Sequence, residues 1–345
     1  MDKIKDSYLY KEDVESILKQ DCNWKLLENK TILLSGATGL IGSILVDMLI
    51  FLNKKFSLNL TLLLITRQDI ISKYNFVQYI KADISNPLNI NKKLDFIIHA
   101  ASNTHPMQYS RMPIQTITTN VFGTYNLLNL QTQNKDCRFI FLSSVEIYGE
   151  DYKNNESGFD ETALGYIDCN TTRNCYNESK RLSETLCAAF KSEKNINYVI
   201  ARLCRSYGPT LRNDDSKALS QFLHNGINNN NIILKSNGKQ YFSYIYSADA
   251  ASAIIYLMLY GKNGEAYNVA DNKSNITLRK LASLIAENCN TKIIFDLPDE
   301  IEKKGFSKVQ RAILNTTKIN KLGWKAQFDI TNGIKRTIKI LKNNL

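Results

Sequence analysis

Apolar and polar positions follow a pattern that is typical of a sheet covered by helices. From residue 31 onward, short apolar runs alternate with longer segments whose apolar residues recur every three or four positions. The short runs predict six strands: Thr31–Ser35, Leu60–Thr66, Val77–Lys81, Phe96–Ala100, Phe139–Ser143 and Tyr198–Arg202. The longer segments predict three helices between them: Ile41–Leu52, Thr116–Gln131 and Tyr176–Lys191. This alternation predicts an α/β fold, a Rossmann doubly wound parallel sheet with right-handed crossovers.

The pattern changes on both sides of this repeat. The first 29 residues form a polar leader with one expected helix, Glu12–Lys19. After Pro209 the expected elements are a helix, a strand and a second helix: Lys217–Asn225, Ile232–Lys235 and Ser247–Tyr260. We therefore divide the chain into a leader (1–29), a Rossmann domain (30–205 with about 243–262) and a smaller C-terminal substrate-binding lobe (206–242 with 263–345).

Composition places the chain among ordinary globular proteins. With 345 residues, 43% hydrophobic and 22% charged, it is long enough for one large domain and a smaller lobe. It has no apolar run of about 18 residues and its N-terminal segment is polar, so we expect neither a membrane span nor a secretory signal. Seven cysteines without a CxxC pair indicate reduced thiols, and three scattered histidines argue against a metal centre. We expect a cytoplasmic protein without a metal.

The net charge of +11 raises the question of nucleic-acid binding. A basic groove would require clustered lysines and arginines, and the lysines here are spread along the chain among asparagines and isoleucines. We interpret the charge as compositional drift together with affinity for a phosphorylated small molecule, and we expect no nucleic-acid partner.

A glycine-rich segment, residues 36–42, follows the first expected strand and opens the first expected helix. In such segments the first glycine permits a tight turn, the second allows a pyrophosphate to approach, and the third lets the helix pack on the strand. Free N–H groups at the helix N-terminus bind anions. The segment therefore predicts a dinucleotide site formed by Gly36, Thr38, Gly39, Leu40, Ile41 and Gly42.

The end of the second strand normally distinguishes NAD from NADP. An acidic residue there binds the ribose hydroxyls, whereas an arginine accommodates the 2′-phosphate. Here the strand ends in Thr66-Arg67 without a carboxylate, so Arg67 is either a contact to the 2′-phosphate or a solvated loop residue. Asp83-Ile84, after the third strand, either holds the adenine edge or belongs to a plain loop. The cofactor is expected to be NAD or NADP.

Four residues carry candidate catalytic chemistry. Tyr176 and Lys180 are four positions apart on one helix, so their side chains converge. An ammonium beside a phenol lowers the pKa of the phenol, which suits proton removal from a sugar hydroxyl. Ser144 lies at the carboxyl end of the fifth expected strand and can bind the same hydroxyl. Glu146 is either a group that exchanges a proton with a carbon next to a ketone or a surface glutamate.

These motifs resemble the extended short-chain dehydrogenase/reductase family, the NAD-dependent epimerases and dehydratases that modify nucleotide sugars. The resemblance covers about residues 30–345 and includes five further motifs: His99-Ala100-Ala101, Asn120–Thr124, Ser143–Gly149, Tyr207-Gly208-Pro209 and Leu322-Gly323-Trp324. It implies a nucleotide-diphosphate-sugar substrate oxidised at C4. It also implies that Ser144, Tyr176 and Lys180 form the catalytic set, and that Ala100, Ala101, Tyr176 and Lys180 contact the dinucleotide. The family's dimers imply a homodimer through helices Thr116–Gln131 and Tyr176–Lys191.

Two stretches, Arg173–Arg181 and Pro106–Thr124, are most similar to the UDP-glucuronate decarboxylases within that family. Glu146 is shared by those decarboxylases and by the 4,6-dehydratases. Glucose-type dehydratases carry an aspartate where Val145 stands, and valine cannot donate a proton to a leaving hydroxyl.

Two other departures from the family pattern concern substrate binding. The family's arginine seven residues before Asp249 is Phe242 here, and its asparagine two residues before the Tyr-Gly-Pro motif is Arg205. Our hypothesis is that Arg205 supplies, from a neighbouring loop, the charge that Phe242 cannot. Arg173 meets either a substrate carboxylate or a nearby backbone group. Lys217 lies either near the diphosphate or on a helix surface.

The sequence thus predicts an NAD(P)-dependent enzyme, most like a UDP-glucuronate decarboxylase. Tyr176 would deprotonate the C4 hydroxyl, and the resulting 4-ketone makes the C5 substituent labile. The alternatives are an NADPH-dependent reductase of a 4-keto nucleotide sugar, a 4,6-dehydratase and a 4-epimerase. A non-catalytic dinucleotide-sensing protein belongs to a different class, whose members tend to lose the tyrosine or lysine that this chain keeps.

Overall fold

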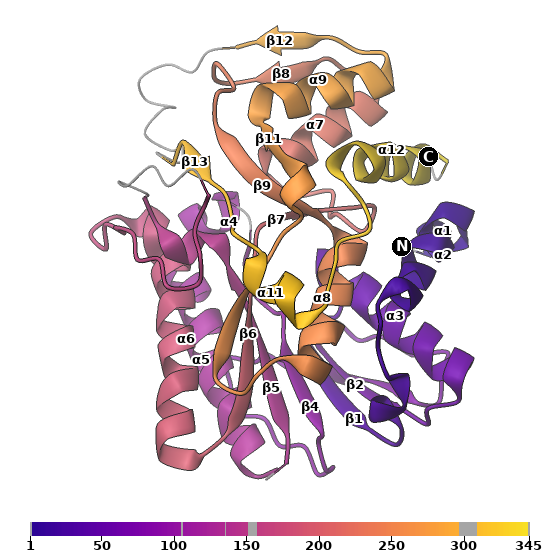
Figure 1. Cartoon of the computed structure of the whole chain (residues 1–345), viewed down its shortest axis with the longest axis vertical. Helices are drawn as coiled ribbons and strands as arrows, with labels where there is room; N and C mark the ends of the chain where they lie inside the picture. The colour runs from indigo at the N-terminus through magenta and orange to yellow at the C-terminus, as the bar shows by residue number, and fades with distance from the viewer. Residues whose placement is uncertain (1, 105, 135, 151–156, 297–308, 344–345) are drawn as a thin grey trace.

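A seven-stranded parallel sheet forms the centre of the computed structural model, which describes residues 2–104, 106–134, 136–150, 157–296 and 309–343 (Figure 1). Its strands are β1 (Thr31–Ser35), β2 (Thr61–Thr66), β3 (Val77–Lys81), β4 (Phe96–His99), β5 (Arg138–Ser144), β6 (Asn197–Leu203) and β10 (Glu265–Val269). The strand order is β10-β6-β5-β4-β1-β2-β3, and every neighbouring pair is parallel. The order reverses between β1 and β4, which confirms the predicted doubly wound sheet.

Helices cover both faces of this sheet. Helices α3 (Leu40–Phe56) and α8 (Ser247–Tyr260) lie on one face, and α5 (Pro113–Thr132) and α6 (Cys175–Lys194) lie on the other (Figure 1). Adjacent residues of β1 enter different cores: Leu34 packs in the core with α3 and α8, and Leu33 packs in the core with α5 and α6. Because both faces are buried there, the inner strands β6, β5, β4, β1 and β2 are apolar over most of their length, which is why they were identifiable from the sequence.

A smaller lobe lies above the sheet in Figure 1 and is built around the central strand β9. Strands β7 and β13 pair with β9 in parallel, and β11 pairs with it in antiparallel fashion. A separate pair joins β8 and β12. The strands are β7 (Arg205–Tyr207), β8 (Ile232–Leu234), β9 (Tyr241–Tyr246), β11 (Asn275–Thr277), β12 (Ile293–Phe295) and β13 (Arg311–Ala312). The helices of the lobe are α7 (Ala218–Ile227), α9 (Leu278–Cys289) and α12 (Ile330–Lys342), whereas α11 (Thr317–Leu322) packs beside β10 of the main sheet.

Two expectations about the organisation of the chain need correction. Residues 265–269, assigned to the lobe from the sequence, form β10 and complete the main sheet beside β6. The expected leader helix Glu12–Lys19 is shifted: α1 (Asp2–Asp6) and α2 (Tyr8–Glu15) are followed by a 3₁₀ turn, Ser16–Lys19. A stripe as short as Val14, Ile17 and Leu18 fits α-helical and 3₁₀ spacing alike, so it could not fix these boundaries.

The leader packs beside the C-terminal helix. Arg336 of α12 contacts Glu12 and Asp13 of α2, so segments more than 300 positions apart in sequence lie side by side. Within the described ranges, no helix is long and apolar enough to cross a bilayer. Those ranges also contain no group of three or more histidine, cysteine or acidic side chains placed to hold a metal ion.

Candidate active site

The glycine-rich turn between β1 and α3 forms a cradle that fits a pyrophosphate. Gly36 has φ +80°, and a Cβ there would lie 2.6 Å from the Ala101 nitrogen. A Cβ on Gly42 would lie 2.0 Å from the Gly36 oxygen, so this glycine is needed for close packing of the helix. Gly39 caps α3, and a Cβ there would meet only the Gly36 oxygen, at 3.4 Å. Open space therefore lies in front of the helix N-terminus, where backbone N–H groups bind anions.

The remaining residues of the predicted dinucleotide site lie around this cradle. Thr38, Leu40 and Ile41 are only partly buried beside Gly39. Ala101 donates its N–H to the Ser35 Oγ at 3.3 Å, which holds the end of β4 against the end of β1. Ala100 and Ala101 thus lie directly beside the glycine turn. These positions fit a dinucleotide bound across the carboxyl ends of β1 and β4.

The residues expected at the adenosine end are at the adjacent strand ends. Thr66 ends β2 and is buried, and its Oγ1 accepts a hydrogen bond from the Gln68 nitrogen at 3.2 Å. Arg67 is exposed in the loop that follows. Asp83 is also exposed and caps its own loop by accepting the Ser85 N–H at 2.9 Å, whereas Ile84 is buried. The geometry is compatible with both roles considered for Arg67 and for Asp83.

Tyr176 and Ser144 come together where β5 meets the start of α6. Tyr176 is the second residue of α6 and is buried, and Ser144 is the last residue of β5. Burial raises the pKa of the Tyr176 phenol, a hydrogen bond with the Ser144 side chain lowers it, and the nearby Glu146 carboxylate raises it. The net direction is upward, so the phenol is protonated at neutral pH in the protein without ligands.

Lys180 lies on the same helix, but its ammonium is held by the strand. Its Nζ donates to the Leu142 carbonyl at 2.7 Å and lies 4.6 Å from the centre of the Phe141 ring. Complete burial lowers the pKa of Lys180 to about 7. The expectation that Lys180 lowers the pKa of Tyr176 is therefore wrong for the unliganded protein. Burial outweighs every neighbouring charge, and Lys180 is not among the groups that shift this phenol.

Glu146 belongs to this cluster and is not a surface residue. It lies in the 3₁₀ turn Val145–Tyr148 directly after Ser144, and 22% of its side chain is exposed. Its Oε1 forms an ion pair with the Nη2 of Arg205 at 3.3 Å. Arg205 comes from β7, so the pair joins the Rossmann sheet to the lobe.

Arg205 lies against Phe242, and it does so from strand β7 and not from a loop as expected. Its guanidinium carbon is 3.6 Å from the centre of the Phe242 ring. β7 and β9 are paired in parallel with Arg205 opposite Tyr244, which places Phe242 two residues away on the neighbouring strand. The Nη1 of Arg205 is buried and has no hydrogen-bond partner among the described residues. A hydrogen-bond donor is thus available beside the cluster of Ser144, Glu146 and Tyr176.

The other two predicted substrate residues lie at different distances from the cluster. Arg173 is half-buried, with its guanidinium carbon 5.9 Å from the centre of the Tyr109 ring, which in turn stacks on Tyr176 at 5.7 Å. Lys217 precedes α7 and forms an ion pair with Asp215 at 3.1 Å. No described contact joins Lys217 to the tyrosine cluster.

Two residues of the site were missed in the sequence. Tyr109 on α4 (Pro106–Arg111) stacks on Tyr176, and burial together with Glu146 raises its pKa to about 12. Asn177 donates to the backbone oxygen of Glu146 at 3.0 Å. Tyr109 lies inside a stretch that resembles the decarboxylases, and Asn177 lies inside the Tyr-x-x-x-Lys motif. Both were therefore visible as parts of motifs, but nothing local indicated their contacts.

A family model and a known relative both match most of this chain. The model of the NAD dependent epimerase/dehydratase family matches residues 32–270. UDP-glucuronic acid decarboxylase 3 of Arabidopsis thaliana is 29% identical over 315 residues, covering 89% of this chain and 87% of the relative.

Solved structures share the fold at lower identity. A UDP-glucose 4-epimerase from Thermotoga maritima superposes with a TM-score of 0.76 at 20% identity, covering 91% of this chain and 99% of the epimerase. A dTDP-glucose 4,6-dehydratase from Streptomyces venezuelae, solved with NAD bound, gives 0.77 at 20% identity, covering 91% and 97%.

Proposed function

The chain is an enzyme that belongs to the NAD-dependent epimerase/dehydratase family, and we propose that it oxidises a nucleotide-diphosphate sugar at C4 and acts at C5, as a UDP-glucuronate decarboxylase does. The observation that carries this proposal is the convergence of Ser144, Tyr176, Glu146 and Arg205 at the carboxyl ends of β5 and β6. An epimerase needs only the first two of these together with Lys180. Glu146 and Arg205 add an ion pair, a carboxylate and a guanidinium, beside these residues.

The roles follow from the positions of the side chains. Ser144 binds the C4 hydroxyl and Tyr176, as the phenolate, takes its proton. Because burial keeps the phenol protonated in the protein without ligands, Tyr176 must first lose its own proton, and a positively charged nicotinamide bound beside it would favour that loss. A dinucleotide held at Gly36–Gly42 would supply the acceptor for the C4 hydride. With a ketone at C4, the bond from C5 to a carboxylate breaks, and its electron pair delocalises into the ketone oxygen that Tyr176 and Ser144 hold. Carbon dioxide leaves, and C5 then takes a proton from the Glu146 side of the site.

The substrate's negative charges would be met by three basic residues. Arg205 has the buried, free Nη1 beside Glu146 and would bind the reacting carboxylate or the diphosphate. Arg173 lies beside the Tyr109 ring, and Lys217, which precedes α7, would meet the diphosphate. Each charge-assisted hydrogen bond of this kind contributes about 1.5–3 kcal/mol.

A reductase of a 4-keto nucleotide sugar is the main rival. The absence of a carboxylate at Thr66 and the exposed Arg67 suit NADPH, the usual reductant, and a reductase would need only Ser144, Tyr176 and Lys180. We propose that the protein takes NAD or NADP, with the choice depending on Arg67. Incubating the purified protein with UDP-glucuronate and either dinucleotide separates the two: carbon dioxide release supports the decarboxylase, and its absence with turnover of a 4-keto sugar supports the reductase.

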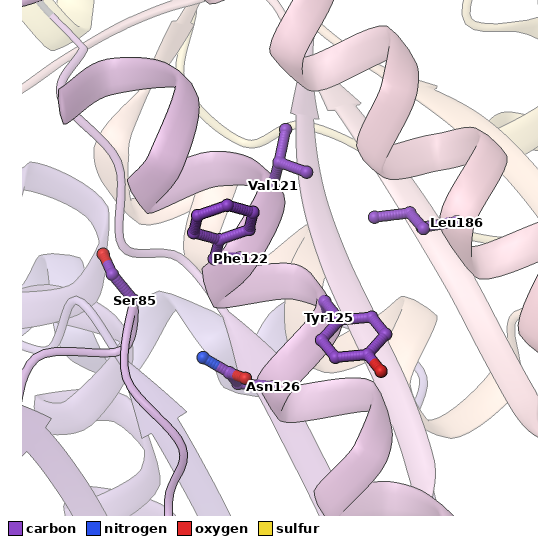
Figure 2. Close-up of a pocket in the computed structure, with 6 residues that line it drawn as sticks. All are labelled: Ser85, Val121, Phe122, Tyr125, Asn126 and Leu186. Carbon is purple, nitrogen blue, oxygen red and sulfur yellow. The ribbon is translucent and has the colours of Figure 1, made fainter. Parts of the chain in front are cut away.

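The outward surfaces of α5 and α6 support a homodimer. Phe122, Tyr125 and Leu182 are 53%, 48% and 48% exposed, which is unusual for large apolar side chains. A pocket of about 360 Å³ opens on this surface, lined by Ser85, Val121, Phe122, Tyr125, Asn126 and Leu186 (Figure 2). We propose that a second copy covers this surface. The seven cysteines are all free thiols, which supports a location in the reducing cytoplasm.

A further inference from the structure

Helix α6 holds the segment that carries Ser144 and Glu146, in addition to carrying Tyr176. Three side chains on α6 donate to main-chain oxygens of this segment. Lys180 reaches the Leu142 oxygen at 2.7 Å, Asn177 reaches the Glu146 oxygen at 3.0 Å, and Arg181 reaches the Ile147 oxygen at 2.6 Å. The positions of the serine and the glutamate relative to Tyr176 are therefore set by α6 itself.

Asn177 differs from the other two because it also reaches a side chain of the site. Its Nδ2 lies 3.5 Å from Glu146 Oε2, at the outer limit of a hydrogen bond, while Glu146 Oε1 faces Arg205 Nη2 at 3.3 Å. The two carboxylate oxygens thus have partners on two different elements, α6 and β7. Asn177 is buried, with 6% of its surface exposed, so few other orientations are open to its amide.

We propose that Asn177 is a positioning residue that, together with Arg205, fixes the orientation of the Glu146 carboxylate toward C5 of the substrate. This inference rests on the proposed function, in which Glu146 serves the step at C5. An amide suits the task because it donates to the carboxylate without bringing a second negative charge. An aspartate at the same position would place two carboxylates side by side, which is unfavourable.

The effect on the two chemical steps distinguishes this role from a merely structural one. Replacing Asn177 by alanine should slow the release of carbon dioxide by about tenfold, the effect of one lost hydrogen bond to a charged group. Oxidation at C4 uses Ser144 and Tyr176, so the appearance of reduced nicotinamide in a single turnover should change little. Asn177→Asp should slow carbon dioxide release more than Asn177→Ala, and Asn177→Ser is available if the alanine variant does not fold.

Two controls complete the experiment. Asn174→Ala removes the same kind of side chain from the start of the same helix, where the Asn174 amide donates to the backbone oxygen of Asp168. This variant should leave both C4 oxidation and carbon dioxide release unchanged. In the Glu146→Gln background, adding Asn177→Ala should cause no further loss, because coupled residues are not additive. Equal slowing of both steps, or full additivity with Glu146→Gln, would overturn the proposal.

A measurement without substrate separates this inference from the proposed function. Hydrogen–deuterium exchange of the backbone amides of residues 145–149 should be faster in Asn177→Ala than in the wild type, and Asn174→Ala should not change it. If the wild type releases no carbon dioxide from UDP-glucuronate, the proposed reaction fails while the exchange result still tests the contact. Unchanged exchange in Asn177→Ala would refute the role of Asn177 whichever reaction the enzyme performs.

Discussion

The guanidinium carbon of Arg205 lies 3.6 Å from the centre of the Phe242 ring, so the charge rests on the face of an aromatic side chain from the neighbouring strand. This contact is a cation–π interaction, and it fixes the plane of the guanidinium while Nη2 reaches Glu146. The two departures from the family pattern that concern substrate binding are therefore in direct contact. Phe242 supplies the surface on which Arg205 lies.

Loss of the Arg205 side chain should weaken substrate binding while the protein stays folded. We expect Arg205→Ala to lower kcat/KM by roughly 10- to 150-fold: KM rises because one charge-assisted bond to the substrate is removed, and kcat falls because Glu146 loses its partner. Arg212→Ala is the matched control because Arg212 is exposed and pairs only with Asp214 among the described residues. The double variant Arg205→Asn with Phe242→Arg should recover part of the loss. An unchanged KM in Arg205→Ala would contradict the assignment.

Tyr176→Phe should remove the proton acceptor and leave binding intact. General acid–base groups contribute about 10²–10⁴-fold, so we expect a fall of that size in kcat with the dissociation constant of the nucleotide sugar nearly unchanged. Tyr109→Phe keeps the ring that stacks on Tyr176 and should have a much smaller effect. Steady-state kinetics and calorimetric binding give the two quantities. Comparable losses in both variants would place the proton transfer elsewhere.

The buried Lys180 side chain should lower the free energy of unfolding by an amount that depends on pH. Burial lowers its pKa from 10.5 to about 7, so between these values the unfolded chain binds a proton that the folded protein does not. The free energy of unfolding therefore rises with pH across this range, and the full cost of the buried charge is present below pH 7. We expect Lys180→Met to abolish activity and yet to stabilise the fold by roughly 2–4 kcal/mol at pH 6, after allowing for the unpaired Leu142 oxygen. Urea unfolding should show this gain shrinking towards pH 10, and a gain that does not vary with pH would contradict it.

The packing of the leader on α12 should depend on the buried ion pair between Asp13 and Arg336. Asp13 is completely buried and accepts hydrogen bonds from Arg336 and Tyr246, and burial raises its pKa to about 6. Because this folded pKa exceeds the unfolded value of 3.8, the contribution of Asp13 to stability falls as pH rises from about 4 to 6.

Arg336→Met leaves the Asp13 carboxylate without its cation, which should lower the free energy of unfolding by about 3–5 kcal/mol at pH 8. The loss should be smaller at pH 5, where Asp13 is protonated. Lys318→Met, which breaks the exposed pair with Glu265, should cost at most about 1 kcal/mol at either pH. Chemical denaturation at the two pH values provides the test, and equal losses for Arg336→Met at pH 5 and pH 8 would contradict it.

A charge on the outward surface of α5 should prevent dimerisation. We expect Phe122→Glu to elute as a monomer while the wild type elutes as a dimer, because a carboxylate would be buried without a partner at the interface. Ile71→Glu is the control, since Ile71 is almost fully exposed on a loop outside α5 and α6. Light scattering after size-exclusion chromatography measures both masses. A monomeric wild type would refute the proposed interface.

The sequence by itself determined six of the seven strands of the sheet, the glycine turn and most of the proposed catalytic set. Strands buried on both faces are continuous apolar runs, and Gly36 and Gly42 are required by contacts within a few residues of the turn or at the adjoining strand end. Tyr176 and Lys180 share a helix face through spacing alone. These features are local, so the order of residues was sufficient to predict them.

Only the tertiary structure decided the contacts that depend on strand pairing and on distant packing. The pairing of β7 with β9 places Arg205 on Phe242, and the pairing of β10 with β6 moves residues 265–269 from the lobe to the main sheet. The burial that raises the pKa of Tyr176 and lowers that of Lys180 likewise comes from elements far apart in the chain. Register and desolvation are properties of the packed molecule, and a residue's sequence neighbours do not specify them.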